Sequence, residues 1–282
     1  MVDSVYIDRV MLNLDGGSRM KRKVSVSVAV LLVWTGIAAG CNPSFSQKRV
    51  ELHILAASSL TEAVKELETV YEASQPEIDI VVSYASSGKL KQQIEQGAPA
   101  DVFLSAGEKE VKELERKGLV NPAERADLLR NELVLIIPEE GRQPVKKFEN
   151  LADSPVDKLA LGLPETVPAG RYAMEALRGT DQWNDLRSRV VYGGNVRQVL
   201  SHVAAGNADA GLVYRTDLSA SRSVKVADVV PPDTYPPIRY PAAVIEGSDH
   251  PKQARSFYRW LKGKKAQSIF KKHGFKGAAA SE

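Results

Sequence analysis

The sequence predicts an α/β fold of two lobes, each a doubly wound sheet flanked by helices. Apolar strands alternate with amphipathic helices along most of the chain, as in sheets whose parallel strands are joined by helical crossovers. The 282 residues exceed what one small core needs and suit two lobes. In addition, "QGAPADVFLS" (96–105) and "AGNADAGLVY" (205–214) share one pattern: a helix end, a glycine, Ala-Asp and a buried strand. This echo favours two similar lobes that face one another.

The first half of the chain alternates strands and helices without a long interruption. Leu60, Val64, Leu67 and Tyr71 form one apolar stripe over residues 60–73, which is the spacing of an amphipathic helix. The short apolar runs around it are typical of buried strands. We therefore expect strands at 50–55, 78–83, 102–105 and 132–137, and helices at 60–73, 88–96 and 108–117.

The second half repeats this alternation after an irregular connection over residues 139–155. Gly274 followed by Phe275 is typical of a helix C-cap with its hydrophobic contact. We expect strands at 158–163, 190–192, 209–214 and 239–245, and helices at 168–177, 196–205, 252–262 and 265–273. Lobe 1 is expected to comprise residues 50–130 plus 226–282, and lobe 2 residues 131–225.

The N-terminal segment has the pattern of an export signal. A basic stretch at 20–23 precedes 16 apolar residues, 24–39, which is short for a membrane span and typical of a signal peptide. Small residues then lead to Cys41, the only cysteine of the chain, which therefore has no partner for an internal disulfide. The pattern resembles a bacterial lipobox, although Ala38 stands where leucine is more common. We expect a signal peptide over 1–40 (with a true start at Met20) and a lipidated tether over 41–49. The alternative is an uncleaved anchor helix.

The net charge excludes a broad electrostatic attraction. It is +3 for the whole chain, and without residues 1–40 there are 33 Lys and Arg against 32 Asp and Glu. No basic stripe with interleaved aromatic residues is present, so we expect no nucleic-acid binding. Affinity for an anion would have to come from a local site.

Four junctions between a strand and the following helix carry small or polar residues, and ligands of α/β sheets bind at such junctions. Ser59 begins the capping-box pattern S-x-x-E, and Ser87 and Asn195 are expected N-caps of two further helices. The fourth helix begins at Pro168 without a polar cap, which predicts unmet backbone N–H groups at residues 169–171.

These helix starts predict an oxyanion site. Hydroxyl and N–H groups are donors, and none of the four junctions places a carboxylate beside the expected ligand. A fully deprotonated tetrahedral dianion needs only donors, whereas monohydrogen phosphate also benefits from an acceptor. The pattern therefore favours sulfate, molybdate or tungstate over phosphate.

The motifs "AASSLTEAV", "SYASSGKLKQQIEQGAPADVFLSA", "VPAGRYAMEAL", "NVRQVL" and "AGLVYRTD" occur in this order. Together with "YPAAVIEG" and "KKHGF" they resemble the bacterial molybdate-binding proteins, over about residues 50–275. The resemblance implies a type II periplasmic-binding-protein fold, with two crossing strands as a hinge near residues 130 and 225. It implies an extracytoplasmic receptor that delivers molybdate, and also tungstate, to an ABC permease. By position in these motifs, the implied ligand-binding residues are Ser59, Ser87, Ala169, Val196 and Tyr214.

In the implied site the serines give hydroxyl and amide donors, Ala169 and Val196 give backbone N–H groups, and Tyr214 gives its phenol. The chain departs from the common motif at Gly88-Lys89 and at Asn195. Lys89 is expected to point to solvent, as most lysines do. The resemblance implies a receptor rather than an enzyme, without a cofactor. We also expect a monomer, because each lobe should bury its own core, and we expect the N-terminal lipid to be its only contact with a membrane.

Two other kinds of protein fit the sequence less well. A sulfate receptor, or a receptor for another tetrahedral oxyanion, would use the same donors. Ser86-x-x-Lys89 matches the S-x-x-K motif of serine acyl-enzymes, but the Ser-Asp-Asn and Lys-Thr-Gly motifs of those enzymes are missing. A G-x-S-x-G motif is also missing, and no His/Cys pair has metal-ligand spacing, so we expect neither a hydrolase nor a bound metal cation. The four histidines are His53, His202, His250 and His273; we expect His53 to be structural.

Overall fold

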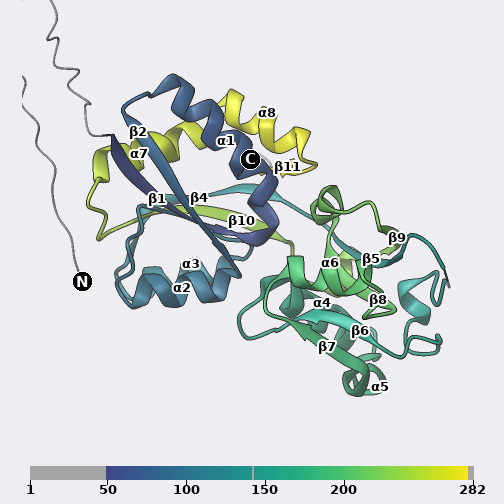
Figure 1. The fold of residues 1–282 in the computed structure, drawn as a ribbon. Helices are drawn as coiled ribbons and strands as arrows, with labels where there is room; N and C mark the ends of the chain where they lie inside the picture. The colour runs from purple at the N-terminus through teal and green to yellow at the C-terminus, as the bar shows by residue number, and fades with distance from the viewer. Residues whose placement is uncertain (1–48, 142, 279–282) are drawn as a thin grey trace, which may run out of the picture. The chain divides into compact units, whose positions relative to one another are not determined.

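The computed structural model describes residues 49–141 and 143–278. The expected signal peptide, Cys41 and the tether as far as residue 48 lie outside the described residues. Within those two ranges, no helix is long and apolar enough to cross a bilayer. The described chain forms two sheets of six and five strands, so the predicted α/β architecture is confirmed (Figure 1).

The first sheet combines strands from both ends of the described chain. Its order is β11-β4-β10-β3-β1-β2. Strand β1 pairs in parallel with β2 and β3, and β10 lies antiparallel between β3 and β4. The strands are β1 (Val50–Ala57), β2 (Ile78–Ala85), β3 (Val102–Leu104), β4 (Val120–Arg130), β10 (Arg239–Ile245) and β11 (Lys276–Gly277).

Helices cover both faces of this sheet. Neighbouring residues of a strand point to opposite faces, so Ile54 packs in one apolar cluster and Leu55 in the other. Helices α1, α7 and α8 lie over one face, and α2 and α3 lie over the other (Figure 1). Their bounds are α1 (Thr61–Ser74), α2 (Ser87–Glu95), α3 (Glu108–Arg116), α7 (Pro251–Leu261) and α8 (Lys264–Lys272).

The second sheet has the order β7-β6-β8-β5-β9. Strand β6 is parallel to β7 and β8, and β5 is antiparallel to β8 and β9, so the pairing scheme around β1 is repeated around β6. The strands are β5 (Leu133–Pro138), β6 (Leu159–Gly162), β7 (Val190–Gly193), β8 (Ala210–Tyr214) and β9 (Val224–Val229), and the helices α4 (Pro168–Gly179), α5 (Trp183–Leu186) and α6 (Val196–Ala204).

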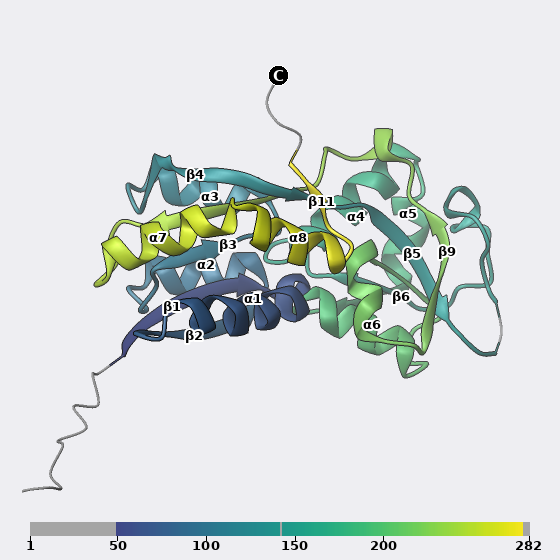
Figure 2. The same ribbon diagram turned by 90° about the horizontal axis from the view of Figure 1, so that it is seen from above.

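Two segments pass between the sheets (Figure 2). The first runs from β4 into β5 through residues 131–132, and the second runs from β9 into β10 through residues 230–238. Strands β4 and β9 were not predicted. Strand β9 pairs with β5 along its length, so the expected lobe boundary at residues 225/226 falls inside a strand of the second sheet.

The repeated Ala-Asp motif has the same structural role in both sheets. The carboxylate of Asp101 accepts the backbone N–H of His53 at 2.6 Å, close to the start of β1. The carboxylate of Asp209 accepts the N–H groups of Asp157 and Lys158 at 2.9 and 2.8 Å, just before β6. In each sheet the aspartate thus holds the beginning of the central parallel strand, and the opposite strand ends face the next helices.

Candidate functional site

A small cavity lies where the carboxyl ends of β1, β2, β6 and β7 meet the helices that follow them. Its empty volume is about 190 Å³, including its opening to solvent. All five residues implied by the sequence line it, and none of the lining side chains is charged. The lining residues are Ala57, Ser58, Ser59, Ser86, Ser87, Ala106, Val167, Pro168, Ala169, Val196 and Tyr214.

At the first junction, the predicted capping box at Ser59 is wrong. A short 3-10 turn, Ser58–Leu60, precedes α1, and the N-cap is Leu60 with no side-chain cap. The hydroxyl oxygen of Ser59 instead accepts the phenol of Tyr240 at 3.0 Å, and Tyr240 in turn accepts the amide of Asn131 at 3.2 Å. Because the acceptor role of Ser59 is thus occupied, its own proton is free to point into the cavity.

At the second junction, the N-cap of α2 is Ser86 rather than the expected Ser87. The hydroxyl oxygen of Ser87 accepts the backbone N–H of Ala106 at 2.9 Å. Its proton is therefore also available to an acceptor in the cavity. As expected, Lys89 is exposed.

The third and fourth junctions offer backbone donors. Helix α4 begins at Pro168 without a side-chain cap, as predicted. The N–H groups of Gly170 and Arg171 bond to the carbonyl of Val167 at 3.0 and 3.2 Å, so only Ala169 retains the unmet N–H predicted for three residues. At the start of α6 the side-chain oxygen of Asn195 accepts the backbone N–H of Gln198 at 3.0 Å, so Asn195 is the N-cap, as predicted. The N–H of Val196 is left next to the cavity.

Tyr214 reaches the cavity from the end of β8 and is 1% exposed. Burial raises the pKa of its phenol well above the ordinary value, so the group is a neutral donor. In this structure its proton goes to the carbonyl of Ala106 at 3.1 Å, across the two lobes. A ligand would therefore have to replace this carbonyl as the acceptor of the Tyr214 proton.

Two arginines near the cavity are paired with carboxylates, Arg171 with Glu110 and Arg197 with Glu62. The guanidinium of Arg171 pairs with Glu110 of the other lobe at 3.0 Å, and 14% and 4% of these two side chains are exposed. Arg197 donates to the carbonyl of Ser58 at 3.3 Å and lies 3.5 Å from Glu62 and 3.9 Å from Asp217. The donors that face the cavity are therefore dipoles and hydroxyls.

Asp217 supports Tyr214 from behind. It is fully buried, and one carboxylate oxygen accepts the backbone N–H of Tyr214 at 3.0 Å. Burial raises its pKa to about 7, although Arg197 and this N–H act in the opposite direction. The nearby carboxylate of Asp217 also contributes to raising the pKa of the Tyr240 phenol. The unfolded chain would lose the Asp217 proton near pH 4.

We expect this carboxyl to make stability depend on pH. Between about pH 4 and pH 7 the folded protein keeps a proton that the unfolded chain releases, so the free energy of unfolding falls as pH rises through this window. Asp217→Asn keeps an acceptor for Tyr214 but does not titrate. From pH 4.5 to 7.5 the wild type should lose on the order of 3 kcal/mol relative to the variant in denaturant unfolding. Parallel pH profiles of the two proteins would contradict this.

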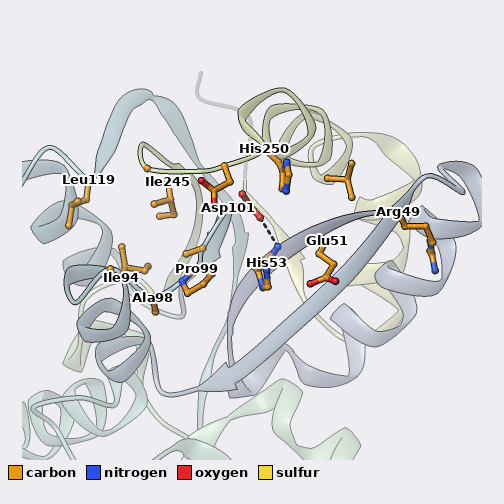
Figure 3. Close-up of a pocket in the computed structure, with 15 residues that line it drawn as sticks. Arg49, Glu51, His53, Ile94, Ala98, Pro99, Asp101, Leu119, Ile245 and His250 are labelled. Atoms are coloured by element: carbon orange, nitrogen blue, oxygen red, sulfur yellow. Dashed lines mark hydrogen bonds between the residues drawn. The ribbon is translucent and has the colours of Figure 1, made fainter. Parts of the chain in front are cut away.

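A second cavity, with an empty volume of about 1410 Å³ including its opening to solvent, lies at the opposite end of the first sheet, where β1 and β3 begin (Figure 3). Its walls carry the carboxylates of Glu51 and Asp101 and the imidazoles of His53 and His250. Asp101 is already engaged by the His53 backbone and by the hydroxyl of Ser248. These carboxylates and that of Asp249 disfavour an oxyanion there. Arg49 lies in the same wall but is already paired with Asp79 at 3.0 Å, so the smaller cavity is the better candidate.

The fold and this cavity together define a two-lobed protein that encloses a small solute between its lobes. Residues 52–276 match the family model of the bacterial extracellular solute-binding proteins. The chain belongs to this family.

Relatives of known sequence and structure agree with this assignment. YvgL of Bacillus subtilis, named as an ABC transporter substrate-binding lipoprotein, is 42% identical over 91% of this chain and 99% of its own length. The molybdate-binding protein ModA of Escherichia coli is 37% identical over 86% and 97% of the two chains. The periplasmic molybdate-binding protein of Azotobacter vinelandii is similar in structure with a TM-score of 0.72, at 26% identity over 79% and 98% of the chains. The predicted periplasmic-binding-protein fold is thereby confirmed.

Proposed function

We propose that this protein captures molybdate, and also tungstate, in the cavity between its lobes and delivers it to an ABC permease. The proposed ligand-binding groups are the hydroxyls of Ser59, Ser87 and Tyr214 and the backbone N–H groups of Ala169 and Val196. They come from both lobes, so a ligand held by all of them favours the closed arrangement.

The observation that carries this proposal is the donor character of the cavity. Ser59 and Ser87 already use their oxygens as acceptors, and the helix starts of α4 and α6 direct N–H groups to the same place. No charged side chain lines the cavity. Such a set of donors suits a tetrahedral dianion without a proton, and the relatives named above add molybdate as the specific ligand.

A titration tests the ligand. The chain without residues 1–41 would be titrated calorimetrically with molybdate, tungstate, sulfate and phosphate at one pH. We expect saturable binding of molybdate and tungstate at one site per chain, and much weaker binding of sulfate and phosphate. Tighter binding of sulfate would identify a sulfate receptor instead, and the proposal for molybdate would fall.

We further infer a receptor without catalytic activity. The S-x-x-K alternative would need Lys89 to activate Ser86, but Lys89 is exposed while Ser86 is buried in the cavity wall. A monomer is expected because the apolar side chains of both lobes are buried within one chain. Lipidation at Cys41 would hold the chain at the outer face of a membrane. Labelling of expressing cells with a fatty-acid probe tests this proposal, and Cys41→Ser is the control that should remain unlabelled.

Two substitutions test the proposed ligand-binding residues. Ser59→Ala and Tyr214→Phe each remove one hydroxyl from the cavity, and each should cost about 1–3 kcal/mol of molybdate affinity, roughly 5- to 150-fold, because a charged acceptor loses a hydrogen bond. Tyr192→Phe, at a tyrosine that is 44% exposed, is the matched control and should bind as the wild type does. Unchanged affinity in both cavity variants would remove the assignment.

A further inference from the structure

The hydroxyl of Ser86 has no hydrogen-bond partner in the described part of the chain. Ser86 is 3% exposed and lines the cavity, and its oxygen is buried and unpaired. A buried hydroxyl without a partner is unfavourable. Its neighbours in the cavity wall, Ser59 and Ser87, both have partners, so Ser86 is the exception.

The contact between the lobes removes one of the donors that could bind this hydroxyl. An N-cap serine normally accepts the N–H of the second or third helical residue. In α2 the second such residue is Gly88, and its N–H donates instead to the carbonyl of Thr166 in the other lobe, at 2.9 Å. No side-chain cap is formed by Ser86. The lobe contact therefore takes a donor that would otherwise bind the serine.

We propose that Ser86 is a further ligand-binding residue, whose hydroxyl donates to the oxyanion held in this cavity. The inference rests on the proposed function, and it adds a hydroxyl that the sequence motifs did not assign. Ser59, Ser86 and Ser87 then supply three hydroxyls from lobe 1, and Tyr214 with the N–H groups of Ala169 and Val196 supplies the donors of lobe 2. An anion in the cavity satisfies the Ser86 hydroxyl without any rearrangement of α2.

The test must separate ligand binding from helix capping. Glycine is nearly as good an N-cap as serine, whereas alanine is a poor one. Ser86→Gly therefore removes the hydroxyl but keeps a residue that is favoured at the N-cap position, whereas Ser86→Ala removes the hydroxyl and places an unfavoured residue there. Ser86→Thr keeps a hydroxyl and a favoured residue. Ser154→Ala, at a serine whose hydroxyl bonds only to Leu151 in the described structure, is the control for loss of a hydroxyl elsewhere.

Calorimetric titration with molybdate should show affinity reduced about 10- to 100-fold in both Ser86→Gly and Ser86→Ala. Ser86→Thr should stay within a few-fold of the wild type, and Ser154→Ala should match it. Wild-type affinity in Ser86→Gly would overturn the inference and leave the proposed function intact, even if Ser86→Ala were less stable. A wild-type protein that binds no oxyanion at all would instead overturn the proposed function, and the role of Ser86 with it.

Discussion

Gly88→Ala should weaken molybdate binding at least 30-fold while the ligand-free protein stays as stable as the wild type. A Cβ atom at position 88 would lie 2.6 Å from the Cα and 2.7 Å from the carbonyl oxygen of Thr166. Both are backbone atoms of the other lobe and cannot move aside as a side chain would. The closed arrangement would also lose the hydrogen bond from Gly88 to Thr166.

The size of the effect follows from these two losses. Steric overlap in a packed contact costs about 1–3 kcal/mol, and a lost hydrogen bond costs about 1 kcal/mol more. Within lobe 1 the same substitution is harmless, because alanine favours a helix over glycine by about 0.5–1 kcal/mol. Ligand affinity should therefore fall while the stability of the free protein is maintained.

Calorimetry with molybdate and thermal unfolding without ligand measure the two quantities. Gly247→Ala is the matched control, because a Cβ there meets nothing within 4 Å. Wild-type affinity in Gly88→Ala would show that the two lobes do not meet at Thr166 in the liganded protein.

Glu110→Gln should have an effect of similar size through charge rather than shape. Glu110 and Arg171 pair across the lobes in a forked contact, with nitrogen–oxygen distances of 3.0 and 3.2 Å. The variant leaves the guanidinium buried without its counter-ion, which costs about 3–5 kcal/mol where the charge cannot reach water. Opening of the lobes restores hydration, so the cost should appear as lost ligand affinity, roughly 100-fold or more.

The double variant Glu110→Leu with Arg171→Met distinguishes charge from packing. Apolar pairs often replace buried ion pairs without loss, so it should recover most of the affinity lost in Glu110→Gln. Glu124→Gln breaks the exposed pair with Arg255 within lobe 1 and should change affinity less than about three-fold. Equal affinities of Glu110→Gln and Glu124→Gln would contradict a role for the buried pair in closure.

The fold was predictable where burial shapes the sequence. Strands β1, β6 and β10 are apolar runs, and they occur where they were expected. Strand β4 reads "VNPAERADLLR", and most of it is exposed or half-buried, so neither an apolar run nor a clear alternation marks it. Strand β9 is similarly half-buried. Both are next to the segments that connect the lobes, which is why the hinge was less predictable than the sheets.

The site was predictable in its location but not in its hydrogen bonds. The motifs brought five residues to one cavity, yet local reasoning assigned Ser59 to a capping box. Its actual partner, Tyr240, is 181 residues away, and no local pattern signals it. The ion pair of Arg171 with Glu110 and the free hydroxyl of Ser86 likewise depend on contacts between the lobes. A serine doublet at a strand end was the available signal for Ser86, but it does not tell which serine caps.

Anomalous diffraction from crystals of the mature chain grown with tungstate tests the central claim most directly, because tungsten is located without reference to the protein. We expect one strong peak in the cavity, with the hydroxyls of Ser59, Ser87 and Tyr214 and the N–H groups of Ala169 and Val196 within hydrogen-bond distance of its oxygens. A peak only at another place on the protein, such as the cavity beside Asp101 and His250, would contradict the account.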